Sequence, residues 1–171
     1  MPTHPAIEGV VREIQAAPSI LVASHINPDG DTLGSALGLA LGMEILGKEV
    51  QLVSPDGVPL TLRALPGWER FQTEPQGEVA LAIAVDCGSW SQLGPLRPFL
   101  EKVPRLVQLD HHGEGQPFGH LSYLDHRAAA TGEMVFDLLR ALNVKMTPPI
   151  AIPLLMAIIT DTGSFRYPST R

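Results

Sequence analysis

The chain has 171 residues, of which 44% are apolar and 18% charged, and its formal net charge is −6. This length suits one domain, or two small ones, and allows a sizeable core. The acidic balance argues against a nucleic-acid binder that works through a basic surface. No apolar run reaches the roughly 18 residues of a membrane span, and the single cysteine, Cys87, excludes a disulfide framework and a thiolate zinc cage. Because the N-terminus also lacks a signal-peptide pattern, we expect a cytoplasmic protein.

Segments with helical periodicity alternate along the chain with short apolar runs. The pattern predicts helices over residues 5–17, 31–47, 95–102, 129–142 and 148–159, and strands over residues 19–24, 48–54, 78–86, 105–110 and 120–125. Residues 55–77, rich in proline and glycine, are predicted to be loop. The alternation predicts an α/β fold, doubly wound, with a mainly parallel β-sheet flanked by helices.

Three glycines recur at four-residue spacing in the predicted helix 31–47. They are Gly34, Gly38 and Gly42, and they would let this helix lie close to the sheet. A phosphate-cradling role is not indicated, because the chain has neither a G-x-G-x-x-G nor a Walker pattern.

The segment SHINPDGDTLGS, residues 24–35, carries three side chains that can act as metal ligands. His25, Asp29 and Asp31 lie within seven residues of one another. One interpretation is a strand-to-helix turn in which Asp31 caps the helix that follows. The other is a cluster of hard-metal ligands. This segment alone leaves both interpretations open.

Further acids and histidines follow other apolar segments. Asp86 ends one predicted strand, Asp110 with His111 and His112 ends another, and Asp161 follows the last helix in a glycine-containing turn. Ligands of open α/β sheets bind at the carboxyl ends of the strands, so these side chains are expected to converge. Imidazole and carboxylate without thiolate suit manganese, magnesium, iron or zinc at a hydrolytic site. The number of ligands favours two ions that share a carboxylate.

Four segments in this order resemble the motifs of the DHH phosphoesterase family: SHINPDGDTLGS, VDCGS, LDHH and TDTGSFRY. The form of the last segment is most similar to the branch of nanoRNases and pAp phosphatases. The resemblance implies a manganese-dependent phosphoesterase that hydrolyses short oligonucleotides or pAp-like 3′-phosphonucleotides through two-metal activation of water.

The resemblance also implies roles for individual residues. One cation would be held by His25, Asp29 and Asp86, and the other by Asp31, Asp86, His111 and Asp161. His112 would contact the scissile phosphate, and Asp110 would orient the imidazoles.

Members of this branch carry a second, C-terminal domain with a glycine-rich, histidine-containing loop that grips the nucleotide. No such loop occurs in residues 1–171, so we expect a single catalytic domain without its substrate-binding partner; a homodimer is compatible with the resemblance. The alternatives are a RecJ-like single-strand exonuclease, a cyclic-dinucleotide phosphodiesterase, or a metal-binding domain with little turnover of its own. A long single strand would need a basic channel, which 12 Lys and Arg against 18 acids do not favour.

Several other residues have a functional and a structural interpretation. Arg166, close in sequence to Asp161, could clamp a substrate phosphate or be a surface arginine. Ser35 and Thr131 are expected to cap or pack. The D-T-G-S stretch also occurs in aspartic proteases, but that chemistry needs two such aspartates sharing a proton, and the chain has one copy.

Overall fold

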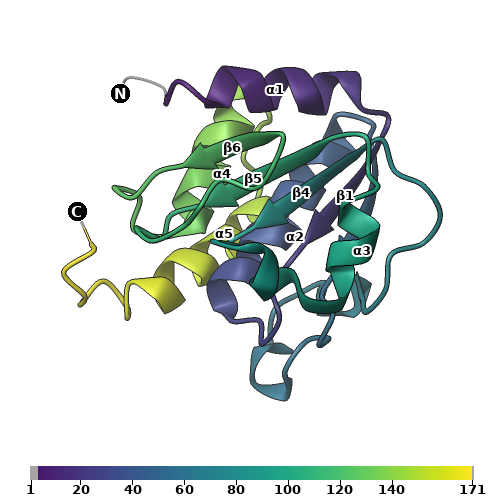
Figure 1. Ribbon diagram of the computed structural model, residues 1–171. Helices are drawn as coiled ribbons and strands as arrows, with labels where there is room; N and C mark the ends of the chain where they lie inside the picture. Colours follow the sequence, from purple (N-terminus) through teal and green to yellow (C-terminus); the bar gives the residue numbers. More distant parts are fainter. Residues whose placement is uncertain (1–3, 171) are drawn as a thin grey trace.

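The computed structural model describes residues 4–170 (Figure 1). The α-helices are α1 (Ile7–Ala16), α2 (Gly30–Ile45), α3 (Arg97–Leu100), α4 (Thr131–Ala141) and α5 (Pro148–Asp161). The strands are β1 (Ser19–Ala23), β2 (Glu49–Val53), β3 (Phe71–Gln72), β4 (Leu81–Val85), β5 (Leu106–Asp110) and β6 (Leu121–Leu124).

All six strands form one parallel sheet in the order β3-β2-β1-β4-β5-β6. The predicted α/β fold with a parallel sheet is therefore confirmed. The chain moves from β1 outward to β2 and β3, and then returns to place β4 on the other side of β1. Between β1 and β4 the strand order reverses, and this is the place where sheets of this kind bind ligands.

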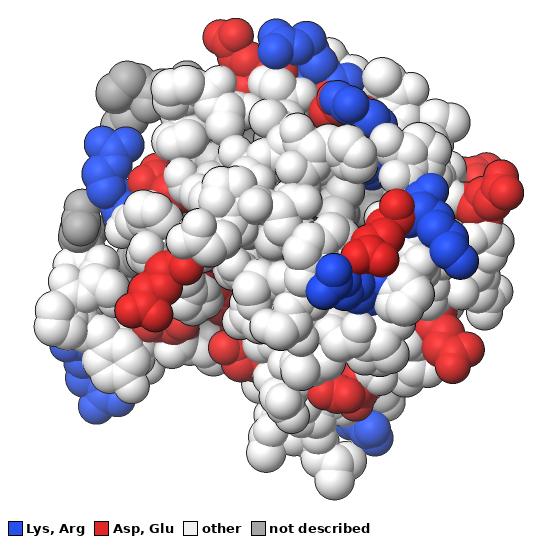
Figure 2. Space-filling view, viewed as in Figure 1, with Lys and Arg blue, Asp and Glu red and all other residues white. Residues whose placement is uncertain are grey.

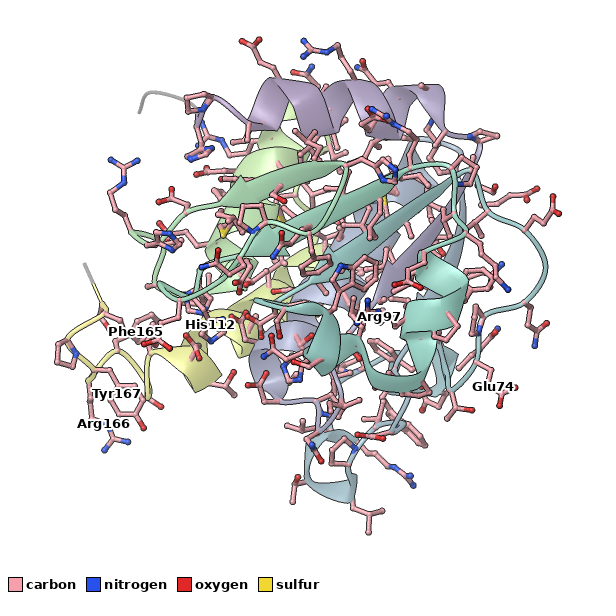
Figure 3. All side chains as sticks on the ribbon, in the orientation of Figure 1. Glu74, Arg97, His112, Phe165, Arg166 and Tyr167 are labelled. Carbon is pink, nitrogen blue, oxygen red and sulfur yellow. The ribbon has the colours of Figure 1, made fainter. Side chains whose placement is uncertain are left out.

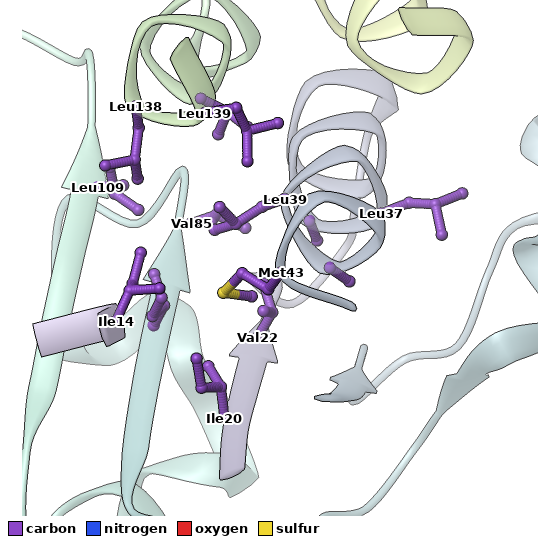
Figure 4. Close-up of a cluster of buried hydrophobic side chains, with 14 of the residues drawn as sticks. Ile14, Ile20, Val22, Leu37, Leu39, Met43, Val85, Leu109, Leu138 and Leu139 are labelled. Carbon is purple, nitrogen blue, oxygen red and sulfur yellow. The ribbon is translucent and has the colours of Figure 1, made fainter. Parts of the chain in front are cut away.

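The two faces of the sheet contribute to two separate cores. In β1, Ile20 and Val22 belong to the larger core, which also contains side chains from α1, α2, α4 and α5. Figure 4 shows part of this cluster, with Met43 of α2 close to the sheet. The alternate residues Leu21 and Ala23 face the smaller core beside α3. Burial on both faces explains why the central strands are continuously apolar.

The glycines of α2 face helices, so the prediction that they adjoin the sheet is wrong. A Cβ at Gly34 would lie 2.3 Å from the carbonyl oxygen of Pro153 in α5, and one at Gly38 would lie 2.5 Å from a methyl of Leu154. A Cβ at Gly42 would similarly meet Leu139 of α4. The absence of side chains thus lets α2 approach α5 and α4 closely.

The boundaries of three other predicted elements differ from the structure. Residues 55–77 contain the short edge strand β3 and two single 3₁₀ turns. In residues 95–102 only Arg97–Leu100 is α-helical, because Gly94 adopts a non-helical conformation and Pro95 follows it. The last helix continues to Asp161, which therefore lies in its final turn and not in the glycine-containing turn. Within residues 4–170, no helix combines the length and apolarity required to cross a bilayer.

Replacing Gly34 by alanine should destabilise the protein, even though alanine is the better helix former. The added methyl would collide with backbone of α5, which cannot move as a flexible side chain can. We expect the free energy of unfolding in urea to fall by about 1–3 kcal/mol. Gly113→Ala is the matched control, since a Cβ there meets no atom within 4 Å; equal stability of the two variants would contradict the close-packing argument.

Candidate metal centre

All six residues predicted as metal ligands meet at the carboxyl ends of β1, β4 and β5. They come from the β1–α2 connection, the ends of β4 and β5, and the last turn of α5; they are His25, Asp29, Asp31, Asp86, His111 and Asp161. Two sets drawn from these six place one ligand atom per residue within 4.8 Å of one another: His25, Asp29 and Asp86, and Asp31, His111 and Asp161. A third set at the same spacing combines Asp86 and His111 with His112. Figure 2 shows acidic side chains inside a hollow at the lower edge of the molecule.

Asp29, not Asp31, caps helix α2, so the interpretation of Asp31 as the N-cap is wrong. The Asp29 carboxylate accepts hydrogen bonds from the backbone N–H groups of Asp31 (2.9 Å) and Thr32 (3.0 Å). Asp31 lies in the first turn of the helix and is 1% exposed. The first turn therefore directs the Asp31 carboxylate into the protein, toward the end of β4.

His25 and His111 both present Nε2 to carboxylates. The Nδ1 of His25 lies 2.7 Å from the carbonyl oxygen of Ile26, and that of His111 lies 3.3 Å from the carbonyl oxygen of Ala128. A carbonyl oxygen can only accept a hydrogen bond, so each Nδ1 carries the ring proton. In a neutral ring, Nε2 is then unprotonated and its lone pair is free to bind a cation. This tautomer is the one that binds metals through Nε2.

The His111 ring shows most clearly that a cation fits here. Its Nε2 is buried and has no hydrogen-bond partner within residues 4–170, although Asp161 Oδ2 lies 3.3 Å away, Asp31 Oδ2 3.7 Å and Asp86 Oδ1 3.8 Å. A lone pair that faces three carboxylates is repelled by them unless a proton or a cation lies between. The donor set of imidazole nitrogens and carboxylate oxygens suits manganese and other hard or borderline divalent cations.

Asp86 lies between the two histidines. Its Oδ2 is 3.5 Å from His25 Nε2, while its Oδ1 is 3.8 Å from His111 Nε2. The residue directly follows β4 and has a φ of 60°, a left-handed conformation that costs energy in residues other than glycine. The turned backbone places one carboxylate oxygen toward each imidazole, as a ligand shared by two ions requires.

Burial and repulsion between neighbouring carboxylates raise the pKa values of two acids in this cluster, Asp31 and Asp161. Burial, followed by the charge of Asp86, raises the pKa of Asp31 well above its usual range, and the N–H groups of Thr131 and Gly132 offset this only in part. Burial likewise raises the pKa of Asp161, with the charge of Asp86 adding to it. Divalent cations would remove this repulsion and keep both carboxylates ionised.

Asp86 and His25 show the opposite balance. Burial acts to raise the pKa of Asp86, but the surrounding imidazoles outweigh it, and the pKa is lowered overall. Burial acts to lower the pKa of His25, but hydrogen bonding to Asp86 and to the carbonyl of Ile26 raises it overall. The site thus favours the charged form of Asp86, in contrast to Asp31 and Asp161.

His112 differs from the other two histidines in its partner and its exposure. Its Nδ1 lies 2.7 Å from Oδ1 of the fully buried Asp110, and its side chain is 51% exposed. The hydrogen bond to Asp110, with the charges of Asp86, Asp110 and Asp161, outweighs desolvation and raises the pKa of His112 to about 9. Since Nδ1 donates its proton to Asp110, it is not available as a metal ligand.

The structure brings Asp110 and His112 to the cluster but leaves Arg166 outside it. The guanidinium of Arg166 donates to the carbonyl oxygen of Gly163 at 2.9 Å, and in Figure 3 it points away from His112. In residues 4–170 it forms no ion pair with the cluster. The phosphate-clamping role expected for Arg166 therefore needs a different side-chain conformation.

Sequence reasoning missed several groups that contact the cluster, among them the backbone N–H of Thr131, which donates to Asp31. The backbone N–H of Gly132 and the hydroxyl of Ser35 bind Asp31, and the hydroxyl of Thr131 binds Asp86. Ser35 and Thr131 were expected to cap or pack. Ser35 lies four residues after Asp31, one turn along the same helix, so its contact was visible in the spacing; no pattern in the sequence connects Thr131 to Asp86, 45 residues away.

The fold and the site together define an α/β protein with a carboxylate–imidazole centre at the reversal point of a parallel sheet. Residues 19–158 match the DHH family, N-terminal domain. The chain therefore belongs to the DHH family, as the four ordered motifs indicated.

The chain is similar to several named proteins and to solved structures. It is 39% identical over 155 residues to the bifunctional oligoribonuclease and PAP phosphatase NrnA of Thermus thermophilus, a match that covers 88% of this chain and 45% of the relative. It is 30% identical to the probable manganese-dependent inorganic pyrophosphatase of Enterococcus faecalis, with coverages of 88% and 50%. The crystal structure of an exopolyphosphatase-related protein from Bacteroides fragilis has the same fold, with a TM-score of 0.90, 24% identity, and coverages of 97% and 52%. The chain thus spans about half the length of these proteins.

In the cation-free protein, Asp110→Asn should lower the pKa of His112 from about 9 toward the ordinary value of 6.5. The reason is that the amide no longer offers a negative charge to the Nδ1 proton. The measurement is an NMR titration of the His112 ring protons in EDTA. Asp137→Asn, which removes a carboxylate of α4 paired with Arg140, is the control and should leave this pKa unchanged. An unchanged pKa in Asp110→Asn would rule out Asp110 as the main cause of the shift.

Proposed function

We propose that this domain is a phosphoesterase dependent on two divalent cations, manganese in preference to magnesium, and that it acts on short oligonucleotides or pAp-like nucleotides. One observation carries the proposal: the Nε2 atoms of two histidines and three carboxylates converge around the carboxylate of Asp86 at the reversal point of the sheet. The name of the Thermus relative, which acts on oligoribonucleotides and PAP, supports this substrate class.

In the proposed arrangement, each of two sets of ligands holds one cation, and Asp86 is shared by both sets. His25 and Asp29 approach one oxygen of Asp86 from the β1–α2 connection, and the first cation would lie among these three residues. Asp31, His111 and Asp161 surround the other side and would hold the second cation together with Asp86. The closeness of the atoms within each set supports this division.

The cations, when bound, would polarise the phosphoryl oxygens and lower the pKa of a water molecule so that hydroxide is available near neutral pH. The remaining chemistry belongs to the side chains. His112 is half-exposed at the edge of the cluster, and its hydrogen bond to Asp110, which raises its pKa to about 9 in the cation-free protein, favours the charged ring. A cationic ring in this position can donate to a non-bridging oxygen of the phosphate. Asp110 holds its Nδ1 proton and so fixes the direction of the ring.

We further propose that residues 1–171 act as one catalytic domain and that a second domain holds the nucleotide part of the substrate. The relatives are about twice as long as the region that matches, which leaves room for such a domain in proteins of this kind. Arg166 is placed on the segment after α5, and we propose that it turns toward the substrate phosphate once a nucleotide is bound. A homodimer is proposed on the family resemblance alone.

Hydrolysis of an RNA dinucleotide and of pAp by this chain, with manganese and with EDTA, tests the proposed function. We expect turnover of at least one substrate with manganese and none with EDTA, because the carboxylates alone repel a phosphate. Inorganic pyrophosphate is the comparison substrate. Hydrolysis of pyrophosphate alone would overturn the nucleotide assignment, and turnover in EDTA would overturn the metal assignment.

Asp86→Asn should lose more manganese and more activity than His112→Ala. The reason is that Asp86 faces both proposed cation positions, whereas the Nδ1 proton of His112 is directed at Asp110. We expect His112→Ala to retain two manganese ions per chain, measured by elemental analysis after dialysis, while its kcat falls by about 10²–10⁴-fold. Full manganese content in Asp86→Asn would contradict the bridging position, and loss of an ion in His112→Ala would make this residue a ligand.

A further inference from the structure

The first two N–H groups of α4, those of Thr131 and Gly132, are not capped by a side chain of their own segment; Glu133 reaches back only to the N–H of Ala129. The N-cap position is occupied by Ala130, and no side chain of the N-cap residue accepts a hydrogen bond from the helix. The first N–H groups of a helix need an acceptor when they are buried. Here Asp31 supplies it from 100 residues earlier in the chain: Thr131 N–H donates to Oδ2 at 2.7 Å, and Gly132 N–H donates to Oδ1 at 3.0 Å.

The same turn of α4 also reaches the second buried carboxylate. The hydroxyl of Thr131 donates to Asp86 Oδ1 at 3.0 Å. Thr131 is 0% exposed, and Asp31 and Asp86 are each 1% exposed. One residue of α4 therefore holds two carboxylates that arrive from α2 and from the end of β4.

We propose that Thr131 is a positioning residue of the cation centre. Its hydroxyl fixes the rotation of the Asp86 carboxylate, so that Oδ2 faces His25 and Oδ1 faces His111, and its N–H fixes Asp31. The inference rests on the proposed function only in taking these carboxylates as cation ligands. A carboxylate turns easily about its last side-chain bond, and ligands held in place by outer hydrogen bonds bind metal more tightly than free ones.

Helix packing makes the position of Thr131 rigid. A Cβ at the neighbouring Gly132 would lie 2.7 Å from Cβ of Ala157 and 3.2 Å from the carbonyl oxygen of Leu154, both in α5. The first turn of α4 is thus held directly against α5. Since α5 also carries Asp161 in its last turn, the hydrogen-bond donor and a third proposed ligand are fixed to the same pair of helices.

A direct contact between Thr131 and the substrate is not compatible with this geometry. Its hydroxyl hydrogen is committed to Asp86, and the residue has no exposed surface. The effect of Thr131 must therefore pass through the carboxylates, which makes cation binding the property to measure.

The test is isothermal titration of the full chain with manganese alone, for the parent and for Thr131→Val, Thr131→Ser and Thr131→Ala. Valine has nearly the shape of threonine but lacks the hydroxyl, so at least one cation should bind about 10–100-fold more weakly. Serine retains the hydroxyl and should bind nearly as the parent does, whereas alanine should bind like valine.

Thr32→Val is the matched control. Thr32 is also a fully buried threonine near the site, but its hydroxyl donates to the carbonyl oxygen of Val85 at 3.2 Å and not to a carboxylate. This variant should lose thermal stability to a similar extent and retain the manganese affinity of the parent. The midpoint of thermal unfolding in EDTA is recorded for every variant to separate loss of fold from loss of binding.

Parental affinity in Thr131→Val, or an equal loss of affinity in Thr32→Val, would overturn the proposal. If the valine variant does not fold, the serine and alanine variants decide the matter, and equal affinities in these two would overturn it. Turnover is measured separately on the parent. If the parent binds manganese but hydrolyses none of the substrates, the proposed function is contradicted, and the affinities of the variants still decide the role of Thr131. If the parent binds no manganese, both proposals are overturned.

Discussion

Two buried carboxylates, Asp31 and Asp86, constrain the rest of this structure. Each is 1% exposed, and an ionised carboxylate removed from water without partners costs several kcal/mol. The fold must therefore surround both with donors or cations. Asp31 receives three hydrogen bonds, from Ser35, Thr131 and Gly132. Asp86 accepts a hydrogen bond from the hydroxyl of Thr131 and otherwise faces the imidazoles of His25, His111 and His112. The partners come from α2, α4 and the end of β5, so satisfying these two charges ties together elements from the whole chain.

The close packing of α2 and α4 against α5 fixes the positions of the side chains in the centre. Glycines of α2 and α4, among them Gly34 and Gly132, allow both helices to contact α5 almost backbone to backbone. As a result, the last turn of α5 brings Asp161 within 3.3 Å of His111 Nε2. A bulkier residue in these interfaces would displace Asp161, a proposed ligand, as well as loosen the core. The contacts of α2 and α4 with α5 therefore contribute both to the stability of the core and to the position of Asp161.

The three histidines of the centre have different tasks because their Nδ1 protons have different partners. In His25 and His111 the proton goes to a backbone carbonyl, which leaves Nε2 directed at carboxylates inside the site. In His112 the proton goes to the carboxylate of Asp110, which favours the charged ring at a half-exposed position. The first arrangement suits metal ligation and the second suits contact with an anion. Neighbouring residues in the sequence, His111 and His112, therefore have different hydrogen-bond partners, in keeping with the different roles proposed for them.

The sequence by itself determined the class of fold and which acids and histidines gather at one edge of the sheet. Alternating helical and apolar segments specified a parallel sheet, and the acids and histidines placed after those segments had to meet at one edge of it. The ordered motifs also identified the family. These predictions succeeded because local periodicity and the position of a residue at a strand end are properties of short segments.

Only the tertiary structure decided which atoms face one another. It made Asp29 the cap of α2 and sent Asp31 across the molecule to cap α4. It also turned the glycines of α2 toward α5 and not toward the sheet, and placed the hydroxyl of Thr131 on Asp86. The cap at Asp29 is local, and an aspartate at that position is a pattern the sequence could have shown. The contacts of Asp31 with α4, of the α2 glycines and of Thr131 have no signature in sequence spacing, because each depends on how two distant segments pack.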